Sequence, residues 1–492
     1  MKKIVLQCII AMPMAAAISN MPAGANQDFQ QWMQQQAQGV QQQKKEFREY
    51  RDKRDREFTA FLKMHWKAIE IVKGEKLDEA PKPDVMPVAP PLSGHQPEKK
   101  PAETKPVAIK PPPVVVNIPE PALVPAKPQG QPVDINFFGR QLRFYVDRQM
   151  QRRLSGGINK DAVADYWSVL SRTDYEDLLD QLKAQNESLQ LTDWAYAAMV
   201  HELAMAVNHN RRNESALLSW FLLAKTGYRA RVAYDSQRIY LLVPSRQELF
   251  EVPYFTFGGK RFYAVAFDGN HQQPGQVFTY DGEYPGTPES LDMKVTPLVA
   301  ASNREERRHL SFRFEGRQYN IDASYDRGRI RFFETYPQLS LDMYFSAGVN
   351  PETAAPLLKQ LGGYIAGMDE QQAVNFLLRF VQTAFKYETD EKQFGRENYL
   401  FPEETLYYPY SDCEDRAVLF AWLVRQLLGL DVVGVDYPGH VATAINFHQP
   451  VQGDSLNYQG KRYIIADPTY INARVGMSMP QVKQYKPGVI SY

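Results

Sequence analysis

The sequence is poor in cysteine and carries no excess of charge of either sign. Two cysteines among 492 residues exclude a disulfide-rich scaffold. The 57 basic and 57 acidic side chains cancel to a net charge of zero, which argues against a nucleic-acid-binding protein or a polybasic membrane anchor. The histidines show none of the spacings that bind metal ions, so we expect neither a metal nor another cofactor.

Long apolar runs are also missing from the sequence, except near the N-terminus. A charged start, a mostly apolar stretch over residues 4–18 and the small residues Ala23-Gly24-Ala25 predict a secretion signal that ends there. Ala15-Ala16-Ala17 is a second candidate cleavage site. Cys8 invites a lipoprotein interpretation, but Gln7 is a poor residue before a lipidated cysteine. Since no later stretch could span a bilayer, we expect a secreted or periplasmic protein without a transmembrane segment.

Two segments of unusual composition follow the predicted signal. Residues 26–77 begin rich in glutamine and continue with charged residues between apolar ones at three- and four-residue spacing, which is typical of an amphipathic helix. This helix either packs on the body of the protein or docks a partner or the cell envelope through residues 27–73. Residues 78–133 hold 16 of the 34 prolines, which remove backbone donors, so we expect an extended linker there.

Globular character begins near residue 134 and continues to the end of the chain. Helical patterns cover about residues 140–225 and 351–388. Alternating apolar residues between turn signals predict strands at residues 238–243, 249–257 and 261–267, and again at 309–314, 318–323 and 330–334 in a β-rich connecting block.

Two stretches of this globular part resemble each other. Trp422 precedes Gly429 by seven residues at the end of an apolar helix, as Trp220 precedes Gly227, at an offset of 202. Further on, Gly460-Lys461-Arg462-Tyr463 matches Gly259-Lys260-Arg261-Phe262 at an offset of 201. Two matches in the same order at nearly the same offset predict an internal duplication. The alternative is two helix-then-strand units that share generic packing signals.

Cys413 is the only cysteine beyond the predicted signal, and an unpaired cysteine in an exported protein invites oxidation unless it has a role. It stands in Asp412-Cys413-Glu414-Asp415 at the start of an apolar helical pattern. The positive end of that helix favours a thiolate, whereas the acidic neighbours oppose it. Most of the activation must therefore come from a base elsewhere.

A histidine and an aspartate supply the other parts of a thiol site. His440 follows the turn Pro438-Gly439, and Asp467 ends a strand before Pro468. Neighbouring strands would bring the carboxylate beside the imidazole, where it fixes the tautomer. Each residue alone is more often structural. Together and in this order they predict Cys413, His440 and Asp467 as catalytic residues.

These motifs resemble those of the transglutaminase-like superfamily of papain-like thiol enzymes, in its bacterial form. The resemblance covers Asp412-Cys413-Glu414-Asp415, Gly439-His440 and Asp467-Pro468-Thr469. It implies an α+β fold in which a core helix packs on an antiparallel sheet, with Cys413 as nucleophile, His440 as general base and acid, and Asp467 as orienting carboxylate. It also implies an oxyanion hole made by the Cys413 backbone N–H and an upstream donor. The candidate donors are Tyr387, Tyr399, Tyr407 and Tyr408.

The two copies of the predicted duplication differ at the reactive positions. The offsets place Arg211, Arg238 and Ala266 opposite Cys413, His440 and Asp467, so the first copy has lost all three reactive groups. Two arginines there would make a cationic site suited to carboxylates, or would simply be solvated. The expected domains are a signal peptide (1–25), an amphipathic helix (26–77), a proline-rich linker (78–133), a degenerate transglutaminase-like domain (134–288), a β-rich connecting segment (289–349) and a catalytic transglutaminase-like domain (350–492).

The expected function is that of an exported thiol enzyme that acts on amides. Cys413 would form a thioester, which water resolves in a peptidase or amidase and an amine resolves in a transglutaminase. The expected partner is a peptide or protein substrate in the cell envelope. The alternative is a non-catalytic envelope scaffold in which the helix and the linker matter most and the triad is vestigial.

Overall fold

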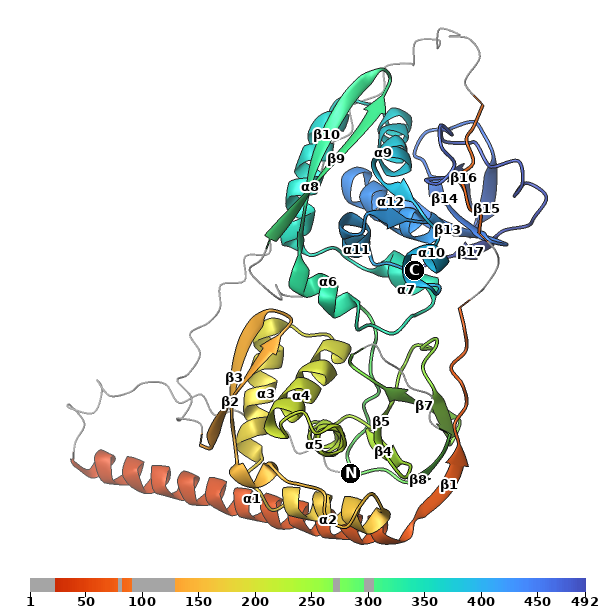
Figure 1. Ribbon diagram of the computed structural model, residues 1–492. Helices are drawn as coiled ribbons and strands as arrows, with labels where there is room; N and C mark the ends of the chain where they lie inside the picture. The colour runs from red at the N-terminus through yellow and green to blue at the C-terminus, as the bar shows by residue number, and fades with distance from the viewer. Residues whose placement is uncertain (1–22, 78–81, 91–128, 269–274, 296–304) are drawn as a thin grey trace. The chain divides into compact units, whose positions relative to one another are not determined.

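The computed structural model describes residues 23–77, 82–90, 129–268, 275–295 and 305–492 (Figure 1). Most of the predicted signal peptide and most of the predicted linker lie outside these residues. The described residues form a mixed α+β fold of helices and mainly antiparallel sheets. The chain divides into two compact units, residues 1–61 and 62–492, and each is described by itself.

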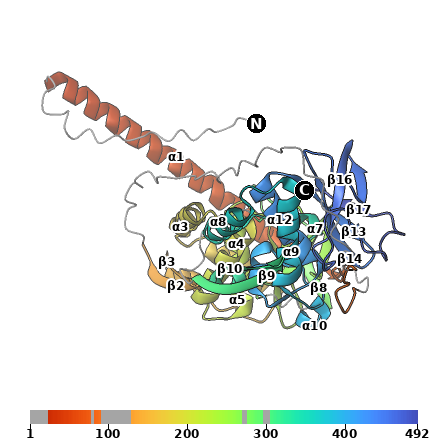
Figure 2. The same cartoon turned by 90° about the horizontal axis from the view of Figure 1, so that it is seen from above.

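The described part of the first unit belongs to one long helix. Helix α1 (Ala23–Met64) is continuous (Figure 2) and carries intrahelical ion pairs between Lys45 and Glu49 and between Lys53 and Glu57. The sequence pattern extended this helix through residue 77, but it ends at Met64. A strand, β1 (Trp66–Glu70), follows and pairs antiparallel with β8 (Gln276–Tyr280). The indole of Trp66 packs on an aromatic pair of the sheet, and this tertiary contact favours the strand.

Residues 129–295 combine a β-hairpin, four helices and a sheet. The hairpin is β2 (Gln131–Phe137) with β3 (Arg140–Val146). A short 3₁₀ turn (Arg148–Met150) leads to helices α2 (Lys160–Leu170), α3 (Glu176–Leu189), α4 (Asp193–Val207) and α5 (Arg212–Lys225). The predicted helical stretch from about residue 140 therefore begins as a strand. Leu142, Phe144 and Val146 are buried at a period of two, which a strand requires.

The sheet that follows has six strands in the order β1-β8-β4-β5-β7-β6. The remaining members are β4 (Arg231–Tyr234), β5 (Ile239–Pro244), β6 (Tyr254–Phe257) and β7 (Lys260–Val265). All of its pairings are antiparallel. The strand predicted at residues 249–257 is shorter, because regular pairing starts only at Tyr254.

A second hairpin and two short helices connect this part to the last domain. The hairpin is formed by β9 (Glu305–Phe314) and β10 (Arg317–Asp326), and it is followed by α6 (Arg327–Phe333) and α7 (Leu341–Ser346). The strand predicted at residues 330–334 is wrong, since residues 330–333 belong to α6 and Glu334 is its C-cap. The Asp326 carboxylate accepts the backbone N–H groups of Gly328 and Arg329 and so starts a helix.

Residues 350–492 hold the candidate site. The helices are α8 (Pro351–Ile365), α9 (Glu370–Ala384), α10 (Asp390–Phe394), α11 (Pro402–Tyr407) and α12 (Cys413–Leu428). The short strands β11 (Lys386–Tyr387) and β12 (Tyr410–Ser411) pair in parallel before α12. A five-stranded antiparallel sheet follows in the order β15-β16-β14-β13-β17, made of β13 (Asp431–Tyr437), β14 (His440–Asn446), β15 (Ser455–Tyr458), β16 (Lys461–Ala466) and β17 (Gly488–Ile490). Helix α12 packs on β13 and β14 (Figure 1).

One part of the predicted linker is held against this domain. Residues 82–90, which we call the strap, are extended apart from a bend at Asp84 and Val85, and Ala89 lies in the apolar core formed by the last sheet. Proline excludes regular pairing along the strap but leaves isolated backbone and side-chain contacts open. None of the described helices is long and apolar enough to cross a membrane.

We expect residues 26–44 to be dispensable for folding. The longer segment, residues 26–90, should not be dispensable. Deleting residues 26–44 should leave the midpoint of thermal unfolding unchanged, because the described side chains from Gln38 to Tyr50 are exposed. Deleting residues 26–90 removes strand β1 and the buried Leu62 and Leu77, and should lower the midpoint by about 5 °C or more. Circular dichroism melting compares the two, and equal midpoints would contradict the prediction.

Candidate active site

Cys413 is the first residue of α12, a helix that is buried on nearly all sides. The helix start is closed by a capping box, in which the backbone N–H of Asp412 donates to the Asp415 carboxylate at 3.3 Å. Gly429 ends the helix with a φ of 66°, a left-handed conformation that glycine adopts without strain. Because α12 packs on β14 and α9, the Cys413 side chain is fully buried.

The structure brings His440 and Asp467 together at one edge of the sheet. His440 is the first residue of β14 and pairs with Tyr437 across the two-residue turn. Asp467 directly follows β16, which pairs with β14. His440 Nε2 lies 2.8 Å from Asp467 Oδ2. The second carboxylate oxygen accepts the backbone N–H of Thr469 at 2.9 Å, so the carboxylate is fixed through both oxygens.

The other ring nitrogen of His440 is available to a reacting group. Nδ1 is buried and has no hydrogen-bond partner among the described residues. Burial lowers the pKa of His440, but the charge and the hydrogen bond of Asp467 more than offset this, so the pKa lies above its ordinary value. An imidazole that accepts a proton at Nδ1 needs a hydrogen-bond partner at Nε2 and an unoccupied Nδ1.

The surroundings of Cys413 favour the neutral thiol over the thiolate. It lies 3.1 Å from Glu414 Oε2 and also accepts the backbone N–H of Val441, the residue after His440. Burial and the carboxylates of Glu414 and Asp412 raise its pKa well above the ordinary value, against smaller opposing effects of Lys82 and the Val441 N–H. Burial and the acidic neighbours together therefore outweigh the groups that favour the thiolate.

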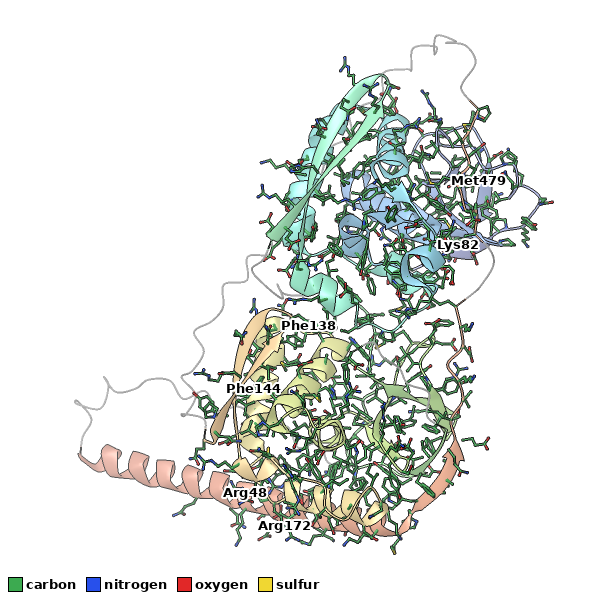
Figure 3. All side chains as sticks on the ribbon, viewed as in Figure 1. Arg48, Lys82, Phe138, Phe144, Arg172 and Met479 are labelled. Atoms are coloured by element: carbon green, nitrogen blue, oxygen red, sulfur yellow. The ribbon has the colours of Figure 1, made fainter. Side chains whose placement is uncertain are left out.

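Four carboxylates next to the thiol surround one ammonium group. We call the four carboxylates, those of Asp390, Glu397, Asp412 and Glu414, the acidic chamber. Lys82 Nζ lies 2.7 Å from Asp412 Oδ2, 2.9 Å from Glu414 Oε2 and 3.9 Å from Asp390 Oδ2, and it also pairs with Glu397. The Lys82 side chain is only 7 % exposed, and Figure 3 shows it among the side chains of the last domain. The sequence did not identify Lys82 as part of the site, although the three acidic residues that flank Cys413 predict a nearby cation.

The acidic chamber is also where the described residues could hold a metal ion. Asp390, Glu397 and Asp412 offer oxygen atoms that all lie within 4.8 Å of one another. Carboxylate oxygens suit hard cations such as Ca²⁺. The Lys82 ammonium already supplies a positive charge at this place, so the geometry does not require a metal.

The strap runs from the acidic chamber toward the strand end that carries Asp467. Behind Lys82, the carbonyl of Pro83 accepts the Tyr387 hydroxyl at 2.7 Å. At the far end, the Ala89 N–H donates to the Ile471 carbonyl at 2.7 Å. The strap therefore covers the side of the domain on which Cys413 and Asp467 lie.

The middle of the strap rests on a buried arginine. Arg416, one turn after Cys413, places Nη1 2.8 Å from Met86 Sδ and donates to the carbonyl of Phe385 at 2.9 Å. Arg416 is fully buried, and burial lowers its pKa to about 10. It ties the strap, the end of α9 and the start of α12 together.

A cavity of about 380 Å³ opens beside His440. Lys82, Tyr399, Glu414 and Val441 also line it. Of the four candidate oxyanion donors, Tyr399 is the one on this cavity. The Tyr387 hydroxyl is bonded to the strap, Tyr407 pairs with Arg327, and Tyr408 donates to Glu334.

Two of the three residues aligned with the candidate triad line another cavity. Arg238 and Ala266 line a cavity of about 400 Å³ in the first globular part, together with the partly buried His201. Helix α5 contributes Arg212 to this lining. The offset pointed to Arg211, which instead stands at the N-cap position of α5 and pairs with Glu214 at 3.6 Å. Helix α5 begins one residue later than the offset implies.

The pH dependence of stability should reflect Glu404, which is buried in α11. Burial raises its pKa to about 8, although it accepts the backbone N–H of Phe401 at 2.9 Å. The folded state then keeps a proton that the unfolded state releases, so this contribution is complete below about pH 4.5 and is lost as pH rises through 8.

We therefore expect Glu404→Gln to flatten the change in the free energy of unfolding between pH 5 and 8. Urea denaturation at both pH values measures this for wild type and variant. The exposed Glu391→Gln is the control and should change nothing. A Glu404→Gln protein that loses as much stability as wild type over this range would contradict the assignment.

A scan against protein-family models finds no matching family, and comparisons with curated proteins and with solved structures find no match either.

Proposed function

We propose that this chain is an exported thiol acyl-transfer enzyme, with Cys413 as nucleophile, His440 as general base and acid, and Asp467 as orienting carboxylate. One observation carries the proposal. His440 is held by Asp467 through Nε2 and keeps Nδ1 free, and the next residue along the strand donates its N–H to the Cys413 thiol. The Nε2 contact is that of a general base with its orienting carboxylate, and the Val441 N–H places the Cys413 sulfur at the residue next to that base.

The proposed reaction has two steps. His440 Nδ1 takes the proton of Cys413, the sulfur attacks the carbonyl carbon of an amide, and the C–N bond breaks as the imidazolium returns the proton to the leaving amine. In the second step water or an amine attacks the thioester, giving its proton to His440, and the thiol is released. Hydrolysis is favoured, because water needs no site of its own. A peptide or protein of the cell envelope is the proposed substrate.

We also propose that the last domain is transglutaminase-like and that the chain is duplicated. Support comes from the two sheets. The order β8-β4-β5-β7-β6 in the first matches β17-β13-β14-β16-β15 in the second, with every pairing antiparallel. In each case the sheet follows a buried helix, α5 or α12, and a β-hairpin lies earlier in the chain, before several intervening helices.

The register of the strands supports the same alignment. Leu241, three residues after Arg238, pairs with Val265, and Thr443, three residues after His440, pairs with Ala466. Arg238 and His440 thus correspond, as do Ala266 and Asp467. A shared strand order could arise twice, but a shared register at the site is a stronger argument for common descent of the two copies.

The burial of the thiol favours one alternative, a non-catalytic envelope scaffold with a vestigial triad. The two proposals differ in the reactivity of Cys413. Iodoacetamide labelling of the full chain, followed over pH by mass spectrometry, should show a base-dependent reaction that His440→Ala slows. Labelling that rises only at the pH of a free thiol, and equally in His440→Ala, would favour the scaffold.

A further inference from the structure

The strap binds the domain as an extended peptide would. It contributes one backbone bridge, between Val88 and Ile471, and one carbonyl contact, from Pro83 to Tyr387. An extended segment that adds backbone hydrogen bonds to the end of a sheet is a common form of peptide recognition. Of the apolar strap side chains, Val85 and Val88 are 79 % and 59 % exposed, whereas Met86 and Ala89 are buried, so apolar burial and polar contacts both hold the strap.

Lys82 makes more ion pairs than any other residue of the strap. The carboxylates of Asp412, Glu414 and Glu397 pair directly with its ammonium, and Asp390 Oδ2 lies 3.9 Å away. Glu414 Oε2 is about 3 Å from both Lys82 Nζ and Cys413 Sγ, so the two atoms are at most about 6 Å apart. The ammonium therefore occupies space directly beside the candidate nucleophile.

The acidic chamber recognises a charge and does not supply a nucleophilic amine. Burial lowers the pKa of Lys82, but Glu414 and Asp412 outweigh burial and keep the ammonium protonated. A protonated amine has no lone pair with which to attack a thioester. An amine bound there would position a substrate, and its nitrogen would not react.

We propose that the acidic chamber is a specificity site for a lysine side chain of an extended peptide substrate, and that the strap occupies this site in the resting protein. The inference rests on the proposed function of Cys413. Lys82 must leave the acidic chamber before a substrate lysine can enter it, and Cys413, His440 and Asp467 are all buried in the resting protein.

Locking the strap tests whether it must leave. Val88→Cys combined with Ile471→Cys places two thiols on the partners of the one backbone bridge. With this disulfide formed, labelling of Cys413 by iodoacetamide should fall at least about tenfold, and reduction should restore it. Mass spectrometry of the Cys413 peptide separates its labelling from that of the new cysteines. Equal labelling of the locked and reduced proteins would overturn the strap as a plug.

Removing the ammonium tests what holds the strap. Lys82→Ala should raise the rate of Cys413 labelling about tenfold or more, as expected when hydrogen bonds to a charged group are lost. Lys392→Ala is the matched control, because Lys392 pairs with Asp84 of the strap at an exposed position. It should leave the rate unchanged, and the same increase in both variants would overturn a special role of Lys82.

A peptide tests the specificity site itself. In the Lys82→Ala protein, an acetylated peptide with the sequence of residues 82–90 should protect Cys413 from labelling. The same peptide with norleucine in place of the lysine has the same shape without the charge and should not protect. Equal protection by both peptides, or by neither, would overturn lysine recognition. Failure of the proposed function looks different: Cys413 would become accessible in Lys82→Ala, yet His440→Ala would not change its labelling.

Discussion

Replacing Cys413 by alanine should lower turnover by a factor on the order of 10⁴ or more, because no other group of the site can form the thioester. The free energy of unfolding should change by only about 1 kcal/mol, since the side chain is small although buried. Mass spectrometry of envelope proteins from cells that produce wild type or the variant measures the activity, and urea denaturation measures the stability.

Three further variants separate chemistry from packing. Cys413→Ser keeps nearly the same volume and should be inactive. His440→Ala should lose almost as much activity as Cys413→Ala, because the general base is gone. Asp467→Asn should be milder, since it disturbs the orientation of the imidazole and leaves the reacting groups in place. Equal product formation by wild type and Cys413→Ala would remove the proposed mechanism.

Breaking the buried ion pair of Arg329 should cost the most stability. Arg329 and Glu403 are each about 2 % exposed, and Nε lies 2.9 Å from Oε2. Arg329 also donates to Thr353 Oγ1 at 2.8 Å. Arg329→Met leaves the Glu403 carboxylate buried without its cation, and we expect the free energy of unfolding to fall by about 3–5 kcal/mol. Urea denaturation of the full chain measures it.

The loss of stability should come from the Glu403 carboxylate that is left buried without a cation. A second substitution separates this effect from lost packing. Adding Glu403→Gln to Arg329→Met removes the charge, while the amide oxygen can still accept the Asn350 N–H that Glu403 accepts at 2.6 Å. The double variant should regain a large part of the stability. Arg246→Met, which breaks an exposed pair with Glu289, should cost less than about 1 kcal/mol. A double variant as unstable as Arg329→Met would contradict a buried-charge penalty.

Local sequence signals predicted the elements that carry the candidate triad. The apolar helix after Cys413, the Pro438-Gly439 turn and the strand that ends before Pro468 all lie where their patterns put them. These signals are short-range, because capping residues, turn glycines and strand periodicity act within a few residues. The sequence pattern predicted the wrong secondary structure where a tertiary contact determines it. The helix expected through residue 77 ends at Met64, where Trp66 joins a sheet.

By itself, the sequence determined the order of the thiol, imidazole and carboxylate along the chain and the helix and strand ends on which they stand. Only the tertiary structure decided that a lysine from the predicted linker lies in an acidic chamber beside the thiol. Lys82 and Asp412 are separated by more than three hundred residues, and a proline-flanked lysine has no periodicity that marks a contact. Pairings over such distances depend on how the whole chain packs, so composition described this segment as a linker while the fold placed it over the candidate site.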